Sequence, residues 1–424
     1  MEGPIRFALT GCGGVADFYL PAFRVLEGVE LVAVIDPDAG ARSYAAEKGR
    51  VPHAFADLDE AIAGVPFDAL VIGSPPTVHA AQAELAAKAG IHLLCEKPMA
   101  ATVRDCERII AAARTAGVKL QLAHMKRFMR GNQKVKAIVD QGLLGTLFMV
   151  ECHWDCNVPQ LVGTYREQEV NMGGSLQDHG PHSFDLVRWW TGNDILRVSA
   201  SIRSVHPGRP TEDAAVVVLD HENGMVSYHH MTRISYGREH SQDTYRLYGT
   251  IGTLVVRNDH HFPTMSIESP EIILYRSNAE AKRFETYHGW NADDSFRQNY
   301  AFLNELVAFR DAIVNDTEPL VTGEDGLRAI ETAVAAYVSS WKGIKVSLPF
   351  REAVDLAALF RDIKERDRAA FGNSSVGEES RPGTTVHEPL YGDTPPRTGE
   401  RWSDELHGQK GRASYDGVGG RIRS

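Results

Sequence analysis

The sequence has few cysteines, no excess of basic charge and no long apolar run. Five cysteines in 424 residues are an odd and small number, which favours a reduced cytoplasmic setting over a disulfide framework. Lysine and arginine together number 45 against 56 aspartates and glutamates, a formal net charge of −11. Because nucleic acids and anionic membranes attract basic faces, neither is an expected partner, and a small neutral or polar substrate is.

The lack of long apolar runs also bears on membranes and metals. No run approaches the roughly 18 apolar residues of a membrane span, and Met1-Glu2-Gly3-Pro4 lacks the charged and apolar regions of a signal peptide. The segment Cys152-His153-Trp154-Asp155-Cys156 contains metal-binding residue types. Its alternation is typical of a strand and no second ligand pair stands at zinc-type spacing, so we predict no metal site.

The N-terminal segment has the pattern of a dinucleotide-binding unit. A short apolar strand over residues 5–10 leads into Gly11-Cys12-Gly13-Gly14-Val15-Ala16, which matches G-x-G-x-x-A, and a helical pattern follows. Glycines let the backbone turn tightly and approach a pyrophosphate, while the helix N-terminus offers amide donors. The candidate cofactor contacts in this loop are Gly11, Gly13, Gly14, Val15 and Ala16.

An acidic residue follows the next predicted strand. The strand is expected over residues 30–35, is apolar from Leu31 onward and leads to Asp36, which stands 20 residues after Ala16. A carboxylate there can accept hydrogen bonds from both ribose hydroxyls and repels a 2′-phosphate, so NAD is expected rather than NADP. Asp36 could instead be a turn residue of Asp-Pro-Asp, a role compatible with ribose binding.

Strands and helices alternate up to about residue 124. The strand 69–72 ends at Gly73-Ser74-Pro75-Pro76, and His79 begins a helix. This alternation predicts parallel strands joined by right-handed crossovers, and hence a doubly wound Rossmann domain over residues 1–124. Ser74 and Pro75 follow a strand at its carboxyl end, where such sheets bind ligands, and are candidate cofactor contacts.

Lys97 stands at the carboxyl end of a later apolar strand, within Glu96-Lys97-Pro98. Ligands of open α/β sheets bind at this edge. Pro98 fixes its own φ and biases Lys97 away from the helical region, so the lysine is expected in an extended turn. Taken alone, the tripeptide could equally place a solvated lysine in a loop.

The pattern becomes rich in strands after residue 125. A large, mostly antiparallel sheet is predicted, with one face open to a ligand or a second subunit. Its strands are expected at residues 147–156, 197–204, 214–220, 225–231, 244–248, 253–257 and 271–275. Further helices are predicted over 296–313, after Thr322 and over 351–371. An α+β domain for substrate and oligomer contacts is therefore expected over 125–350, followed by a C-terminal helix over 351–371.

The last part of the chain, residues 372–424, is rich in glycine, proline and charge and cannot form its own core. It is either a disordered tail or an arm that packs on a neighbouring subunit.

A second segment with chemistry-bearing residues interrupts the strands. Asp178 and His182 are four residues apart and Asp185 follows three later, so in a helix all three share one side. Histidine exchanges a proton near neutral pH, and a nearby carboxylate can orient it or bind a substrate hydroxyl. The alternative is structural, with Asp178 as a helix N-cap and His182 as a packed side chain.

Three motifs together make the chain resemble the glucose-fructose oxidoreductase, inositol dehydrogenase and rhizopine-catabolism (Gfo/Idh/MocA) family. They are Gly11-Cys12-Gly13-Gly14-Val15-Ala16, Glu96-Lys97-Pro98 and Gly174…Asp178-x-Gly180-x-His182-x-x-Asp185, within residues 5–349. The resemblance implies a Rossmann domain joined to an open-faced sheet domain, NAD(P)-dependent oxidation or reduction of sugars, cyclitols and related alcohols, and a homodimer or homotetramer.

The same resemblance implies that Lys97, Asp178 and His182 are catalytic. His182 would exchange the hydroxyl proton, Lys97 would polarise the oxygen, and Asp178 would hold a neighbouring hydroxyl or orient His182. It also places His79 and Glu96 near the cofactor. From location alone, the candidate substrate contacts are His153, Asn157, Tyr165 and Arg166.

Two other functions remain open at this level. An enzyme that recycles its NAD would oxidise a sugar transiently, eliminate a glycosidic substituent and reduce the product back. A non-catalytic sensor would be expected to lack Lys97 or His182, and both are present.

Overall fold

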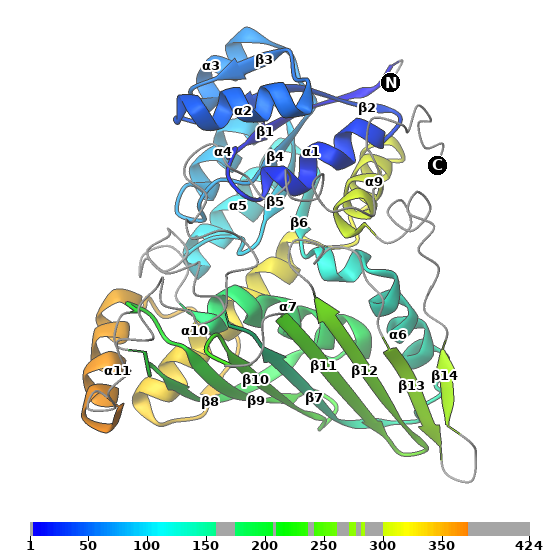
Figure 1. Cartoon of the computed structure of the whole chain (residues 1–424), viewed down its shortest axis with the longest axis vertical. Coiled ribbons are helices and arrows are strands. Elements are labelled where there is room, and N and C mark those ends of the chain that lie inside the picture. Colours follow the sequence, from blue (N-terminus) through cyan, green and yellow to red (C-terminus); the bar gives the residue numbers. More distant parts are fainter. Residues whose placement is uncertain are drawn as a thin grey trace, which may run out of the picture. The chain divides into compact units, whose positions relative to one another are not determined.

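The computed structural model describes residues 3–157, 174–206, 209–235, 241–260, 271–276, 281–284 and 300–371. The candidate substrate contacts Tyr165 and Arg166 and the tail or arm expected over 372–424 therefore lie outside the described residues. The described chain forms two compact units (Figure 1). The first comprises residues 3–130 and 300–327, and the second comprises the described residues of 131–284 and 328–371.

A six-stranded parallel sheet forms the centre of the first unit (Figure 1). Its strands are, in spatial order, β3 (His53–Phe55), β2 (Val29–Ile35), β1 (Ile5–Thr10), β4 (Ala69–Ile72), β5 (His92–Glu96) and β6 (Leu120–Ala123). Between them run α1 (Ala16–Val25), α2 (Ala39–Gly49), α3 (Leu58–Gly64), α4 (His79–Lys88) and α5 (Val103–Ala116). The order 3-2-1-4-5-6 confirms the predicted Rossmann domain, whose switch point lies between β1 and β4.

Local sequence explains these elements. The apolar strand β4 is buried at every position, as expected of a parallel strand covered on both faces by helices. The hydroxyl of Thr102 accepts a hydrogen bond from the Asp105 amide (3.1 Å) and caps α5, and Gly117 ends that helix at φ +68°.

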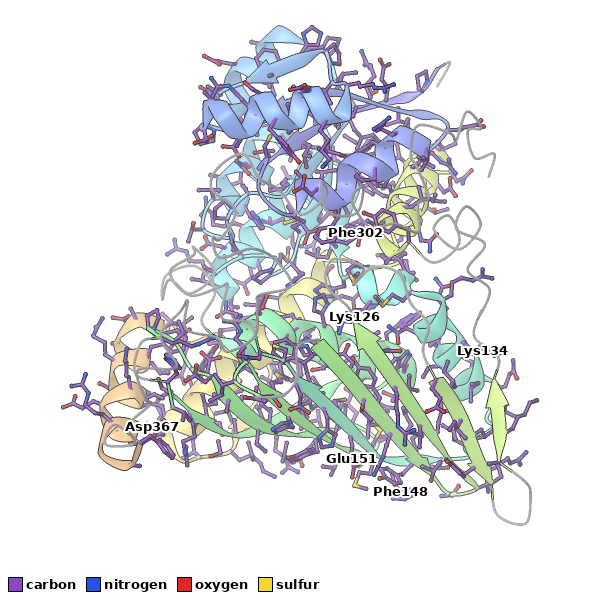
Figure 2. All side chains as sticks on the ribbon, in the orientation of Figure 1. Lys126, Lys134, Phe148, Glu151, Phe302 and Asp367 are labelled. Carbon is purple, nitrogen blue, oxygen red and sulfur yellow. The ribbon has the colours of Figure 1, made fainter. Side chains whose placement is uncertain are left out.

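A helix distant in sequence completes the first unit. Helix α9 (Ala301–Val314) packs on α1 and on the 3₁₀ helix η1 (Met125–Phe128). Phe302 of α9 stacks on Phe18 of α1 with ring centroids 5.0 Å apart (Figure 2), and Arg310 donates to the Glu27 carbonyl (2.9 Å). Residues 300–327 thus pack with the Rossmann sheet, whereas the sequence pattern places them in the second domain.

A nine-stranded sheet forms the second unit (Figure 1). Its spatial order is β14 (Lys282–Phe284), β13 (Glu271–Arg276), β12 (Gly252–His260), β11 (Ser241–Gly249), β7 (Leu147–Asp155), β10 (Val226–Thr232), β9 (Ala214–His221), β8 (Ile195–Arg203) and β15 (Val346–Ser347). Every strand pair is antiparallel except β7 with β10, which confirms the mostly antiparallel sheet.

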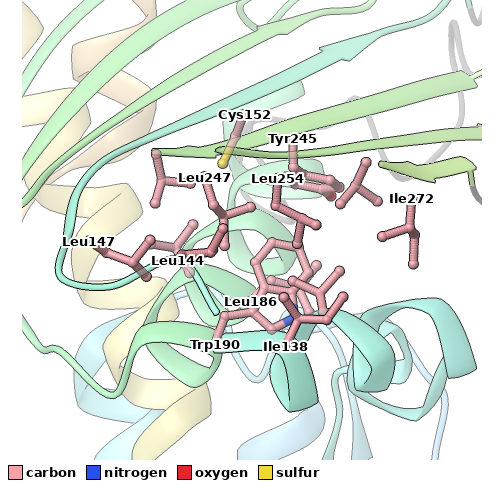
Figure 3. Close-up of a cluster of buried hydrophobic side chains, with 14 of the residues drawn as sticks. Ile138, Leu144, Leu147, Cys152, Leu186, Trp190, Tyr245, Leu247, Leu254 and Ile272 are labelled. Atoms are coloured by element: carbon pink, nitrogen blue, oxygen red, sulfur yellow. The ribbon is translucent and has the colours of Figure 1, made fainter. Parts of the chain in front are cut away.

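Helices α6 (Arg130–Asp140) and α7 (Ser175–Thr191) pack on one face of this sheet. Helices α10 (Gly323–Lys342) and α11 (Leu356–Phe371) contact the backbone of β8, near one edge of the sheet. Trp190 of α7 and Ile138 of α6 pack against Cys152, Tyr245 and neighbouring strand residues in one buried cluster (Figure 3). No helix in the described parts of the chain has both the length and the apolar character to cross a bilayer.

The C-terminal helix begins later than the sequence predicts. Residues 351–355 are not helical, and the side chain of Asp355 accepts from the Ala358 amide (3.0 Å) at the start of α11. The buried carboxylate of Glu331 accepts from the Phe350 amide (2.6 Å) and from the Arg351 guanidinium. These contacts hold the preceding segment outside the helix, so the predicted start at residue 351 is wrong.

Candidate active site

The glycine loop after β1 presents backbone rather than side chains. At Gly11, φ is +83° and an added Cβ would lie 2.4 Å from the Gly73 carbonyl carbon and the Ser74 nitrogen, so only glycine fits. At Gly13 and Gly14 an added Cβ would meet nothing within 4 Å. Helix α1 begins directly after the loop, and its N-cap residue Val15 makes no side-chain capping hydrogen bond. Exposed glycine backbone at a helix N-terminus fits the pyrophosphate of a dinucleotide.

Asp36 is fixed beside this loop. Its Oδ2 accepts from the Cys12 amide and its Oδ1 accepts from the Asp38 amide, both at 2.8 Å. A carboxylate has about four lone-pair positions, so both oxygens can still accept from ribose hydroxyls. Asp36 is thus the turn residue of Asp-Pro-Asp. Its place beside the glycine loop also agrees with the predicted hydrogen bonds to the ribose hydroxyls of the cofactor, which stay a prediction.

His79 joins the loops that follow β4 and β5. Its ring is fully buried, with Nε2 2.7 Å from the Ser74 carbonyl oxygen and Nδ1 3.1 Å from the Met99 carbonyl oxygen. Burial lowers the pKa of His79 below its ordinary value. The geometry makes His79 a residue that positions Ser74 and the Lys97 turn; direct contact with the cofactor stays a prediction.

Gln82 is a residue that the motif search missed. Its Nε2 donates to Thr10 Oγ1 (3.1 Å) and its Oε1 accepts from Ser74 Oγ (2.6 Å), so it links the ends of β1 and β4. Sequence offers only a weak signal for it, a glutamine in an otherwise alanine-rich helix.

Lys97 follows β5 at the same edge of the sheet and is half-buried. Its amide donates to Oε2 of Glu96 (3.0 Å), and the other oxygen of Glu96 lies 2.9 Å from the Tyr19 hydroxyl. Glu96 itself is buried, and its hydrogen bond to the Lys97 amide holds the Lys97 turn in place. The structure therefore gathers the glycine loop, Asp36, Ser74, His79, Glu96 and Lys97 at the carboxyl edge of the first sheet.

In the second unit, helix α7 carries Asp178 and His182 on one side, as predicted. The helix begins at Ser175, and a distant carboxylate binds its first turn. Oε2 of Glu212 accepts from the Gly174 amide (2.5 Å), and Oε1 accepts from the Leu176 amide (2.8 Å) and the Tyr337 hydroxyl (3.0 Å). The alternative that Asp178 caps this helix is therefore wrong. Burial raises the pKa of the Glu212 carboxyl to about 7.

Asp178 forms a buried ion pair that sequence reasoning missed. Nη2 of Arg233 lies 2.9 Å from Oδ2 of Asp178, and the arginine side chain is fully buried. The charge of Arg233 also lowers the pKa of Glu212, against the larger effect of burial. Residues 227, 229 and 231 of the alternating strand β10 are buried, and Arg233 continues that series. A basic residue at an inward position signals a buried carboxylate partner.

Further contacts hold α7 against the sheet around His182. Ser183 Oγ lies 3.0 Å from His229 Nδ1, and burial lowers the pKa of His229 to about 3. The ring of His179 stacks on Trp154, with centroids 4.2 Å apart, and lies 5.9 Å from the ring of His182. His182 is 8% exposed, so its orientation is set by packing rather than by solvent.

The two remaining described candidates, His153 and Asn157, belong to the second sheet. In β7, Val150, Cys152 and Trp154 are buried while Glu151 and His153 alternate with them, and Glu151 projects from the sheet face away from α7 (Figure 2). The structure therefore does not bring His153 together with Asp178 and His182. Asn157 pairs with Ile234, next to Arg233. Among the described residues, no group of three or more histidines, cysteines or carboxylates is arranged to hold a metal.

Comparisons with known proteins agree with these two units. Residues 5–124 match the family described as "Oxidoreductase family, NAD-binding Rossmann fold", and residues 132–255 match "GFO/IDH/MocA C-terminal domain". The rhizopine catabolism protein MocA of Rhizobium meliloti is 31% identical over 232 residues, which are 52% of this chain and 70% of that protein. The D-apiose dehydrogenase of Paraburkholderia graminis is 26% identical over 352 residues, which are 82% of this chain and 90% of that enzyme.

Solved structures show the same architecture. The aldose-aldose oxidoreductase of Caulobacter crescentus, crystallised with glycerol, is 26% identical with a TM-score of 0.70, and the match covers 81% of this chain and 100% of that one. The resemblance read from the three motifs is thereby confirmed. The chain belongs to the Gfo/Idh/MocA family of oxidoreductases, with an NAD-binding Rossmann domain.

Proposed function

We propose that this oxidoreductase transfers hydride between NAD and a secondary alcohol or ketone of a sugar, glycoside or cyclitol. One observation carries the proposal: the buried Arg233 fixes the carboxylate of Asp178 on the same side of α7 as His182, so an acid–base residue and a hydroxyl-binding residue are held in register. The names of relatives such as D-apiose dehydrogenase and aldose-aldose oxidoreductase support a sugar-like substrate.

In the proposed reaction, three side chains act on the substrate hydroxyl groups. His182 takes the hydroxyl proton during oxidation and returns it during reduction. The Lys97 ammonium donates a hydrogen bond to the same oxygen and stabilises its developing negative charge. Asp178 accepts a hydrogen bond from a neighbouring hydroxyl and so orients the sugar ring. NAD, when bound, supplies the hydride acceptor or donor.

Asp36 supports a preference for NAD over NADP. Two backbone amides hold its carboxylate in place, so it cannot swing away from a 2′-phosphate, and the resulting repulsion disfavours NADP. We also propose a cytoplasmic setting, which suits five buried cysteines that form no disulfide.

The test is absorbance at the reduced-nicotinamide wavelength with purified protein, NAD or NADP, and a panel of sugars, glycosides and cyclitols. Turnover with NAD is expected, and Lys97→Met and His182→Asn should each lower kcat by about 10²-fold or more. Lys134→Met, at an exposed position of α6, is the matched control and should turn over normally.

Two outcomes would contradict the proposal. Loss of substrate with no net reduced nicotinamide, together with release of a glycosidic substituent, would identify an enzyme that recycles its NAD. Tight NAD binding with no chemistry on any panel member would favour a sensor.

A further inference from the structure

We propose that Glu305 is a positioning residue for Lys97, because it shares a proton with Glu96 through the Tyr19 hydroxyl. This inference rests on the proposed role of Lys97. All four residues belong to the first unit, with Glu305 on α9, Tyr19 on α1, and Glu96 and Lys97 at the end of β5.

The contacts form one continuous chain. The Tyr19 hydroxyl oxygen lies 2.8 Å from Oε1 of Glu305 and 2.9 Å from Oε1 of Glu96. Oε2 of Glu96 then accepts from the Lys97 amide at 3.0 Å. Tyr19 and Glu305 are fully buried and Glu96 is 7% exposed. A hydroxyl has one proton, so Tyr19 can donate to only one carboxyl group and must accept a hydrogen bond from the other.

One of the two carboxyl groups must therefore carry a proton. Glu96 accepts from the Lys97 amide, which suits the ionised form. Burial, and next the negative charge of Glu96, raise the pKa of Glu305 well above its ordinary value. The donor order is then Glu305 carboxyl to Tyr19 oxygen, Tyr19 hydroxyl to Glu96, with a single negative charge on Glu96.

Other charged and titratable groups lie on the segments that pack around α9. The buried charged and titratable side chains of the segments around α9 are Asp17 and Tyr19 on α1, Cys95 and Glu96 on β5, and His124, Lys126 and Arg127 at η1, while Arg24 on α1 is exposed. Arg127 pairs with Asp325 at 2.9 Å. Of these groups, Glu96 and Tyr19 act on the pKa of Glu305.

The shared proton has a functional consequence. Deprotonation of Glu305 at high pH would leave two buried negative charges on either side of one hydroxyl, and Glu96 would lose its fixed orientation. The Lys97 turn, whose amide donates a hydrogen bond to Glu96, would then shift. A shift of this kind lowers kcat more than it lowers cofactor affinity, because transition-state contacts are sensitive to small displacements.

The variant Glu305→Gln keeps the size and the hydrogen-bond donor of the protonated side chain but removes its ability to titrate. The glutamine amide can donate to Tyr19 as the protonated acid does, but it cannot titrate. We expect a kcat within about twofold of wild type at neutral pH and loss of the fall in kcat on the alkaline side. Glu305→Ala removes the donor and should lower kcat about tenfold at every pH, while the dissociation constant of NADH, measured by fluorescence, stays within about twofold. Glu47→Gln, at an exposed position of α2, is the control.

Thermal unfolding supplies a readout independent of activity. Since the pKa of Glu305 is raised in the folded protein, wild-type stability falls as pH rises above the unfolded pKa, and Glu305→Gln does not share that fall. The difference between the melting temperatures of Glu305→Gln and wild type should therefore move in favour of the variant as pH increases. A constant difference across pH, or an unchanged alkaline fall in kcat, would overturn the proposal. Absence of turnover in wild type with the stability difference present would instead count against the proposed function.

Discussion

Arg233→Met removes a fully buried guanidinium that lies 2.9 Å from the Asp178 carboxylate. At this distance the attraction is about 6 kcal/mol with an effective dielectric constant of about 20. Desolvation offsets part of it, and loss of one partner from a buried pair typically destabilises a protein by about 3–5 kcal/mol. We expect the free energy of unfolding to fall by about 4 kcal/mol, within the range for buried pairs.

Urea unfolding followed by tryptophan fluorescence measures this change, because Trp154 and Trp190 are buried in the same unit. Arg246→Met, on strand β11 of the same sheet, is the matched control. Its side chain is 48% exposed and lies 3.9 Å from Glu151, so its loss should change stability by about 0.5 kcal/mol or less.

A double-mutant cycle with Asp178→Asn isolates the pair. The combined variant should lose less stability than the sum of the single variants, with a coupling energy of about 2–3 kcal/mol. Arg233→Met should also lower kcat/KM about as much as Asp178→Asn does. Equal stability of the Arg233→Met and Arg246→Met variants, or a coupling energy near zero, would refute the argument that this ion pair organises α7.

Two further predictions concern the helix cap and the glycine loop. The pKa of Glu212 is raised from 4.5 to about 7 in the folded state, so its contribution to stability is present below pH 4.5 and is lost as pH rises through 7. Urea midpoints should show that wild type loses about 3 kcal/mol relative to Glu212→Gln between pH 4.5 and pH 8, and parallel pH profiles would contradict this. Gly11→Ala should destabilise the first unit by about 3 kcal/mol because its Cβ would lie 2.4 Å from the backbone at Gly73, whereas Gly13→Ala should leave stability unchanged and weaken NADH binding. Thermal unfolding and NADH fluorescence titration check this pair, and equal stability of the two variants would be the contrary result.

The local pattern of the sequence was enough to locate the cofactor loop and most of the sheet. Gly11 and Asp36 stand where the motif spacing predicts them, because the turn after β1 needs a positive φ with no room for a Cβ, and the end of β2 places a carboxylate beside that turn. The strands from β7 to β13 were predicted from runs rich in strand-forming residues. Strands β14 and β15 were missed because three and two residues are too few to show a period.

The sequence by itself determined the Rossmann motif, the alternating strands and the helix on which Asp178 and His182 share a side, because these features depend on residues close together in the chain. Only the tertiary structure decided which groups stabilise them. Arg233 reaches Asp178 across 55 positions, Glu212 reaches Leu176 across 36, and Glu305 reaches Tyr19 across 286. Such pairs leave no periodic trace in the sequence, since a buried charge is compensated by whatever residue the fold places within hydrogen-bond distance.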